Sequence, residues 1–192
     1  MPKIFSKSGE TLLEVLIALT VVTVAAAAAG SAIMSAVQGL SLSRNYLVAQ
    51  NLADEGIEAV KNIRDTNWMK FPINKSTCWL VIAEVSNGSE CETAESFSYL
   101  EGGEASNDYW LSPANGKWTA TRQENDIDSQ NIAKYSLGLS PDFYRAIRVS
   151  AQTNNGENGM TDSITIDSIV KWYEGSKLYS ITGREILTNY LE

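Results

Sequence analysis

The sequence predicts an α+β fold in which a long N-terminal α-helix, transmembrane and then amphipathic, packs against a small antiparallel β-sheet head. Three observations predict it. Residues 15–37 form a run of 23 residues without a charge. Apolar residues then recur at helical spacing, and the C-terminal part alternates apolar and polar residues in β-rich segments. With 192 residues the chain has room for one modest domain.

The uncharged run 15–37 predicts a membrane-spanning helix. At 1.5 Å per residue it covers about 35 Å, enough for a hydrocarbon core of about 30 Å. The segment 1–9 contains Lys3 and Lys7 and no acidic residue, which favours a cytoplasmic N-terminus and a C-terminal part outside the cytoplasm. A secretory signal peptide cut near Gly30 and a plain single-pass anchor are alternative interpretations of the same segment.

The residues at the start of this run carry a more specific pattern. Residues 9–19 are Gly-Glu-Thr-Leu-Leu-Glu-Val-Leu-Ile-Ala-Leu, after a short basic leader. This resembles the N-terminus of type IV prepilins and of type II secretion pseudopilins. The resemblance implies a leader of residues 1–9, cleavage by prepilin peptidase between Gly9 and Glu10, and N-methylation of Glu10. Position 10 is Glu where the family usually has Phe.

Glu14 is a candidate functional residue within this pattern. A carboxylate at the start of a transmembrane helix is costly, so it is expected to have a role. It could also lie at the headgroup boundary or complement the helix dipole. In the family that the segment resembles, a glutamate at this position is thought to pair with the N-terminal amine of a neighbouring subunit. The resemblance therefore implies a role for Glu14 in assembly and processing.

Beyond residue 37 the pattern becomes that of an amphipathic helix. The apolar and small residues of one face recur at steps of three and four: Leu42, Tyr46, Ala49, Ala53, Gly56, Val60 and Ile63. We expect one helix over residues 10–66, which fails near Asp65 and cannot resume at Pro72. Residues 49–68 also resemble the helix of minor pilins of the pilus modification protein kind, in which Ala-x-x-Leu-Ala-x-Glu-Gly-Ile-Glu runs into Arg-Asp-x-x-Trp.

Residues 67–192 are expected to form a β-rich, extracytoplasmic head. Three strands are predicted at residues 142–152, 162–173 and 177–188, the last two joined by a tight turn at Gly175. Their antiparallel meander is expected to cover the apolar stripe of the helix. Asn115 and Gly116 predict a second hairpin. Residues 90–108 and 122–131 are expected to be loops.

Several side chains of the head are candidates for a disulfide, a metal site or a binding surface. Cys78 and Cys91 are expected to form a disulfide outside the cytoplasm, the alternative being two free thiols. The acid-rich stretch 125–129, which contains Asp126 and Asp128, could hold calcium through oxygen ligands, although it lacks the EF-hand spacing. Five aromatic residues could form a binding patch or fill the core: Trp79, Tyr99, Tyr109, Trp110 and Trp118.

The composition excludes several other functions. The chain has 15 Lys and Arg against 23 Asp and Glu, a net charge of −8, so we expect no nucleic-acid partner. Histidine is absent, which excludes His-based nucleophile systems and His-ligated zinc and haem. Two cysteines cannot form a four-thiolate site. We therefore expect no enzymatic activity, no catalytic residue, no cofactor and no metal.

The resemblance as a whole implies a minor pilin-like structural subunit of a type IV pilus. The implied partners are other pilin subunits in a helical fibre, prepilin peptidase, the inner-membrane assembly platform, and membrane lipid before assembly. The implied location is the cytoplasmic membrane and then a pilus on the cell surface. One alternative is a pseudopilin of a type II secretion system, which shares every N-terminal feature. Another is a membrane-anchored extracellular binding domain that does not assemble.

Overall fold

The computed structural model describes residues 8–82, 91, 94–98, 108–114, 116–123, 127–128, 135–139, 142–154 and 161–189. The chain divides into two compact units, Met1–Asn45 and Tyr46–Glu192. Most of the implied leader, residues 1–7, lies outside the described residues, and so do the larger parts of the predicted loops 90–108 and 122–131.

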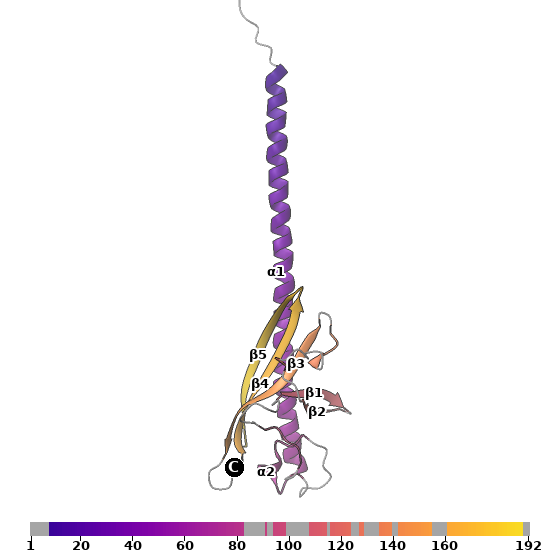
Figure 1. The fold of residues 1–192 in the computed structure, drawn as a ribbon, viewed down its shortest axis with the longest axis vertical. Coiled ribbons are helices and arrows are strands. Elements are labelled where there is room, and N and C mark those ends of the chain that lie inside the picture. Colours follow the sequence, from indigo (N-terminus) through magenta and orange to yellow (C-terminus); the bar gives the residue numbers. More distant parts are fainter. Residues whose placement is uncertain are drawn as a thin grey trace, which may run out of the picture. The chain divides into compact units, whose positions relative to one another are not determined.

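A single helix, α1, spans Ser8–Lys70 without a break and contributes to both units (Figure 1). It therefore continues beyond residue 66, where the sequence predicts its end. The polar residues there do not break the helix because the side chain of Asn67 is hydrogen-bonded. Its amide donates to the carbonyl oxygens of Trp79 and Val81, at 3.1 and 2.7 Å. The helix ends immediately before Phe71 and Pro72, where proline cannot continue it.

The second unit contains a five-stranded antiparallel sheet in the order β2-β1-β3-β4-β5 (Figure 1). Its strands are β1 (Asp108–Ala114), β2 (Lys117–Arg122), β3 (Phe143–Asn154), β4 (Thr161–Glu174) and β5 (Lys177–Thr188). The three predicted C-terminal strands and both predicted hairpins are confirmed. Gly116 and Gly175 adopt the positive φ angles, 77° and 61°, that such tight turns require. A short helix, α2 (Lys75–Cys78), was not predicted.

The C-terminal part of α1 and the inner face of the sheet bury one another, which confirms the α+β fold. Within this unit the predicted stripe is buried at Ala49, Ala53, Gly56, Val60 and Ile63. The matching face of β4 is fully buried at Ile164, Ile166, Ser168, Val170 and Trp172. The helix stripe has period 3.6 and the strand has period 2, as expected for elements that each bury one face.

Two glycines allow the helix and the sheet to approach closely. A Cβ atom on Gly56 of α1 would collide with Ser168 Oγ and lie 3.0 Å from Ile147 Cδ1. A Cβ atom on Gly183 of β5 would lie 3.1 Å from Ile57 Cδ1. Each glycine therefore leaves room for side chains of the other element.

Candidate functional site

The N-terminal part of α1 exposes apolar side chains on all sides. Its large apolar residues are each more than half exposed: Leu12, Leu13, Val15, Leu16, Ile17, Leu19, Val21, Val22, Val24, Ile33, Met34, Val37 and Leu40. A helix that is apolar all round belongs in lipid or in the interior of a protein assembly. Among the described residues α1 is the one helix that is long and apolar enough to span a membrane.

The polar side chains of the uncharged run are satisfied within the helix itself. Residues 15–37 contain four hydroxyl groups, and each donates to a backbone carbonyl three or four positions earlier. The bonds run from Thr20 to Ile17 (2.8 Å), Thr23 to Thr20 (2.9 Å), Ser31 to Ala28 (2.9 Å) and Ser35 to Ser31 (3.0 Å). Such back-bonding is how Ser and Thr are accommodated where no water is present.

The predicted processing and assembly residues lie at the start of this helix. Gly9 and Glu10 are in its first turn, and the side chain of Glu10 lies outside the description. Glu14 follows one turn later and is exposed. The implied scissile bond and the carboxylate of Glu14 are therefore on one continuous helix, directly before the uncharged run.

A repeat of small residues in the same segment was not recognised from the sequence. Small residues occupy every fourth position from Ala27 to Ser43, and all are exposed: Ala27, Ser31, Ser35, Gly39 and Ser43. Small residues four apart lie on one helix face and allow close helix–helix approach in membranes. The regular four-residue spacing is the signal that could have identified this face.

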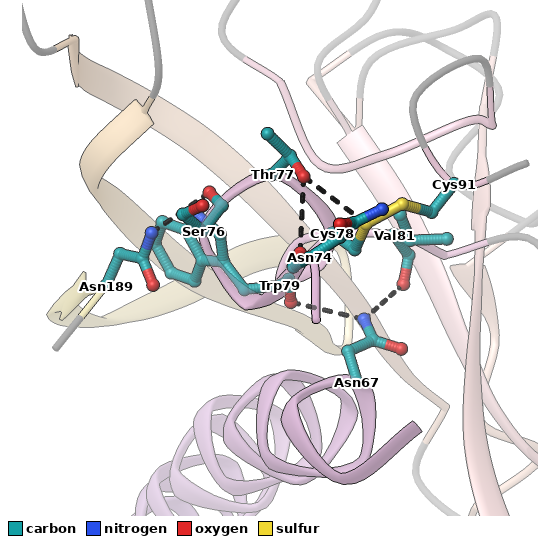
Figure 2. The surroundings of a disulfide bond; sticks show 9 residues. All are labelled: Asn67, Asn74, Ser76, Thr77, Cys78, Trp79, Val81, Cys91 and Asn189. Carbon is teal, nitrogen blue, oxygen red and sulfur yellow. Dashed lines mark hydrogen bonds between the residues drawn. A yellow bond between two sulfur atoms is a disulfide. The ribbon is translucent and has the colours of Figure 1, made fainter. Parts of the chain in front are cut away.

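Cys78 and Cys91 form a disulfide close to the C-terminal end of α1 (Figure 2). Both cysteines are buried, and they contact Phe71 and Val81 in a small apolar cluster. Figure 2 shows Asn67 of α1 donating to the carbonyl groups of Trp79 and Val81, which follow Cys78 at the start of the segment that the disulfide closes. The disulfide and Asn67 together hold this segment against the end of the helix, which is a structural role.

A buried arginine connects α1 with the sheet. Arg145 is 3% exposed, and its Nη1 donates to the carbonyl oxygen of Leu52 at 3.0 Å. The same atom lies 3.2 Å from Glu55 Oε1, and the guanidinium lies over the ring of Trp118. The sequence placed Arg145 in an apolar alternation but gave no sign of these partners.

The proposed aromatic patch is largely core. Trp79 and Tyr109 are fully buried, whereas Trp110 and Trp118 are only half-buried. Tyr99 lies outside the described residues. The burial of the first two shows that they stabilise the head rather than present a binding surface.

The outer face of the sheet carries a network of charges around Asp108. This carboxylate is fully buried and accepts two hydrogen bonds from Arg148, at 2.6 and 2.9 Å, and one from the backbone N–H of Ile127 at 2.8 Å. Asp128 accepts from Arg148 at 2.9 Å and from Lys171. The Lys171 hydrogen bond, with a smaller contribution from Arg148, lowers the pKa of the Asp128 carboxyl.

This network bears on the calcium interpretation of residues 125–129. Of these residues only Ile127 and Asp128 are described. The carboxylate of Asp128 is engaged by two cationic side chains, and the described residues contain no group of three or more metal-ligating side chains. Asp128 acts here as the partner of Arg148 and Lys171.

Comparison of the chain with family models, with curated proteins and with solved structures found no significant match. The functional inference therefore depends on the residues and geometry described above.

Proposed function

We propose that the chain is a minor pilin-like structural subunit of a type IV pilus, processed by prepilin peptidase and assembled through its N-terminal helix. One observation carries the proposal. The prepilin-like residues 9–19 open a helix whose first part is apolar on all sides and whose last part is built into a β-sheet head. The pairing of an uncovered apolar helix with a folded head suits a subunit that is first anchored in lipid and later packed in a fibre.

The proposed topology places the N-terminus in the cytoplasm and the head outside. Lys3 and Lys7 favour this orientation. The Cys78–Cys91 disulfide fits an oxidising compartment. Before assembly the protein resides in the cytoplasmic membrane, and after assembly it is part of a pilus on the cell surface.

In the proposed mechanism, prepilin peptidase cleaves the bond between Gly9 and Glu10. The apolar helix then moves from lipid into the fibre core, so it exchanges one apolar environment for another. Glu14 pairs with the new N-terminal amine of a neighbouring subunit. Such a pair is strong at low dielectric and specifies register, because an unpaired carboxylate there is costly. The chain itself performs no covalent chemistry; the peptidase and the assembly platform are separate proteins.

The first test is the N-terminal residue and the mass of the mature protein from membranes or sheared surface fibres. We expect a chain that begins at Glu10, and a mass one methyl group higher if the new N-terminus is methylated. A start near Gly30 would contradict the proposal and indicate a secreted domain. An intact N-terminus would indicate an anchored binding domain that does not assemble.

The second test compares two acidic residues of α1. Glu14→Ala is expected to insert normally but to be lost from fibres, whereas Glu58→Ala, an exposed acid in the head unit, is expected to incorporate like the wild type. Equal incorporation of both variants would remove Glu14 from the mechanism. Recovery of the chain with a secretion machine and its absence from sheared fibres would favour the pseudopilin alternative.

A further inference from the structure

β5 is a long, regular strand at one edge of the sheet. All 12 of its residues pair with β4 without a register shift. Among the described residues no strand pairs with its other side. Natural edge strands are commonly short, or interrupted by a bulge or a proline, because an open edge is a template for another strand. β5 is neither short nor interrupted, and its charged residues are Lys177, Arg184 and Glu185, whereas β2 at the opposite edge has 6 residues.

The turn before β5 determines which backbone groups face the open edge. Glu174 and Lys177 flank the two-residue turn and are directly opposed. The pair that closes such a hairpin exchanges backbone hydrogen bonds, and the bonding direction alternates along a strand. The even-numbered residues of β5 therefore direct their N–H and C=O groups away from β4. Five of these six side chains, all but that of Thr188, are exposed on the face opposite α1: Leu178, Ser180, Thr182, Arg184 and Ile186.

We propose that β5 pairs with β5 of a second copy of this chain, antiparallel and centred on Thr182. In this register Leu178 of each copy opposes Ile186 of the other. These are the two large apolar side chains that β5 exposes, at 43% and 62%. The Leu178–Ile186 contact forms twice in the pair, so these side chains are covered in both copies. Thr182 opposes its own counterpart, and apolar and Thr–Thr pairs of this kind stabilise neighbouring strands.

The charges of β5 agree with this register. Arg184 opposes Ser180 of the second copy, so no like charges face each other. Lys177 lies diagonally across from Glu185 of the second copy, within reach of long side chains of opposite charge. A shift by two residues would place Leu178 opposite Arg184 and move Ile186 beyond the end of the paired strand. The register centred on Thr182 is thus the one that matches both the apolar and the charged side chains.

The symmetry of the pair fixes the relative direction of its two heads. A two-fold axis perpendicular to the joined sheet reverses the strands, so β5 and residues 46–70 of one copy run opposite to those of the other. The two heads of the pair are therefore antiparallel.

Cysteine cross-linking of the full-length protein in mild detergent tests the register. Directly opposed, hydrogen-bonded residues have Cα atoms about 5.5 Å apart, within the range of a disulfide. Under mild diamide oxidation Thr182→Cys should give about tenfold more cross-linked dimer than Ser180→Cys, whose two copies would be about 14 Å apart. A mixture of Ser180→Cys and Arg184→Cys chains should cross-link again. Equal dimer from Thr182→Cys and Ser180→Cys, or none from either, would overturn the proposal.

A second variant separates pairing from random collision. Ile186→Lys added to Thr182→Cys should lower the cross-linked fraction about tenfold, because it removes both apolar pairs. Leu139→Lys, an exposed apolar residue outside the sheet, should leave it unchanged. Circular dichroism and an intact Cys78–Cys91 disulfide verify the fold of each variant. An Ile186→Lys chain that cross-links as well as its parent would contradict the proposal.

A mixture of Leu178→Cys and Ile186→Cys chains tests the direction of the pair. The two positions are directly opposed in the antiparallel register and are expected to cross-link with each other, whereas cross-linking of each variant only with itself would overturn the antiparallel arrangement. These outcomes are independent of leader cleavage. A chain that starts at Glu10 but does not cross-link refutes only the pairing, and a chain that cross-links but starts near Gly30 refutes only the pilin proposal.

Discussion

The helix α1 has the same backbone conformation in two units of the molecule but opposite patterns of burial. In residues 11–41 every side chain is exposed, including the large apolar ones. In residues 49–63 one face is buried by the sheet and the other carries charges. Helix formation is therefore a local property of the chain, whereas periodic burial appears only where a second layer covers the helix.

Substitution of one glycine in each unit tests this difference, and it has the largest expected effect on stability. Gly56→Leu should destabilise the head by about 3 kcal/mol or more, because Ser168 and Ile147 already occupy the space. Gly39→Leu meets nothing within 4 Å and should slightly favour the helix, since leucine has the higher helix propensity. Thermal unfolding of both full-length variants in the same detergent would measure the difference. Equal unfolding temperatures would contradict the close approach at Gly56.

Reduction of the disulfide should have the next largest effect, and only on the head. Cys78 and Cys91 are separated by 13 positions. In the chain-entropy model a loop of that size contributes about 3 kcal/mol. We expect a Cys78→Ser/Cys91→Ser variant to unfold at lower denaturant concentration, as monitored by tryptophan fluorescence. Its helical signal from the N-terminal segment should be unchanged, and a joint loss of both signals would contradict the division into two units.

A smaller loss of stability is expected from the charge network on the outer face. Asp108→Asn should cost about 2 kcal/mol, because it weakens the hydrogen bonds of a fully buried carboxylate to Arg148 and Ile127. The control is Arg184→Gln, which removes an ion pair made by an exposed arginine and should cost less than Asp108→Asn. Urea unfolding of the two variants would rank them. A larger loss from Arg184→Gln would show that burial does not set the strength of these pairs.

The smallest expected effect is a pH dependence from Asp128. Because the pKa of this carboxyl is lowered in the folded head, its contribution is present above the ordinary aspartate value near 3.8 and is lost as the pH falls through the lowered value. Its side chain is 55% exposed, so solvent screening keeps the contribution small. Asp128→Asn should flatten the acid limb of a plot of stability against pH. An unchanged acid limb would remove Asp128 as a source of that dependence.

The elements that the sequence predicts are those whose signals are local. The stripe from Ala49 to Ile63, the alternation in β3 and β4, and the turns at Gly116 and Gly175 are each contained in a short window, and the structure confirms them. The end of α1 was misplaced because its stabilising partners, the carbonyl groups of Trp79 and Val81, lie outside such a window.

The same reasoning explains which side-chain partners were missed. Arg145 and Leu52 are 93 positions apart, and Asp108 and Arg148 are 40 apart. The alternation of apolar and polar residues along a strand does not distinguish a buried arginine with distant partners from an exposed arginine. Only the order of the strands brings these pairs together, and that order depends on contacts between distant segments.

The inward-bonded hydroxyl groups of residues 20–35 make α1 a self-contained element. Because Thr20, Thr23, Ser31 and Ser35 each use a carbonyl of their own helix, none of them requires a partner from its surroundings. Transfer of this segment between lipid and a protein interior breaks no side-chain hydrogen bond in either direction. A helix built in this way can be inserted, withdrawn and inserted again, with the same internal bonding at every stage.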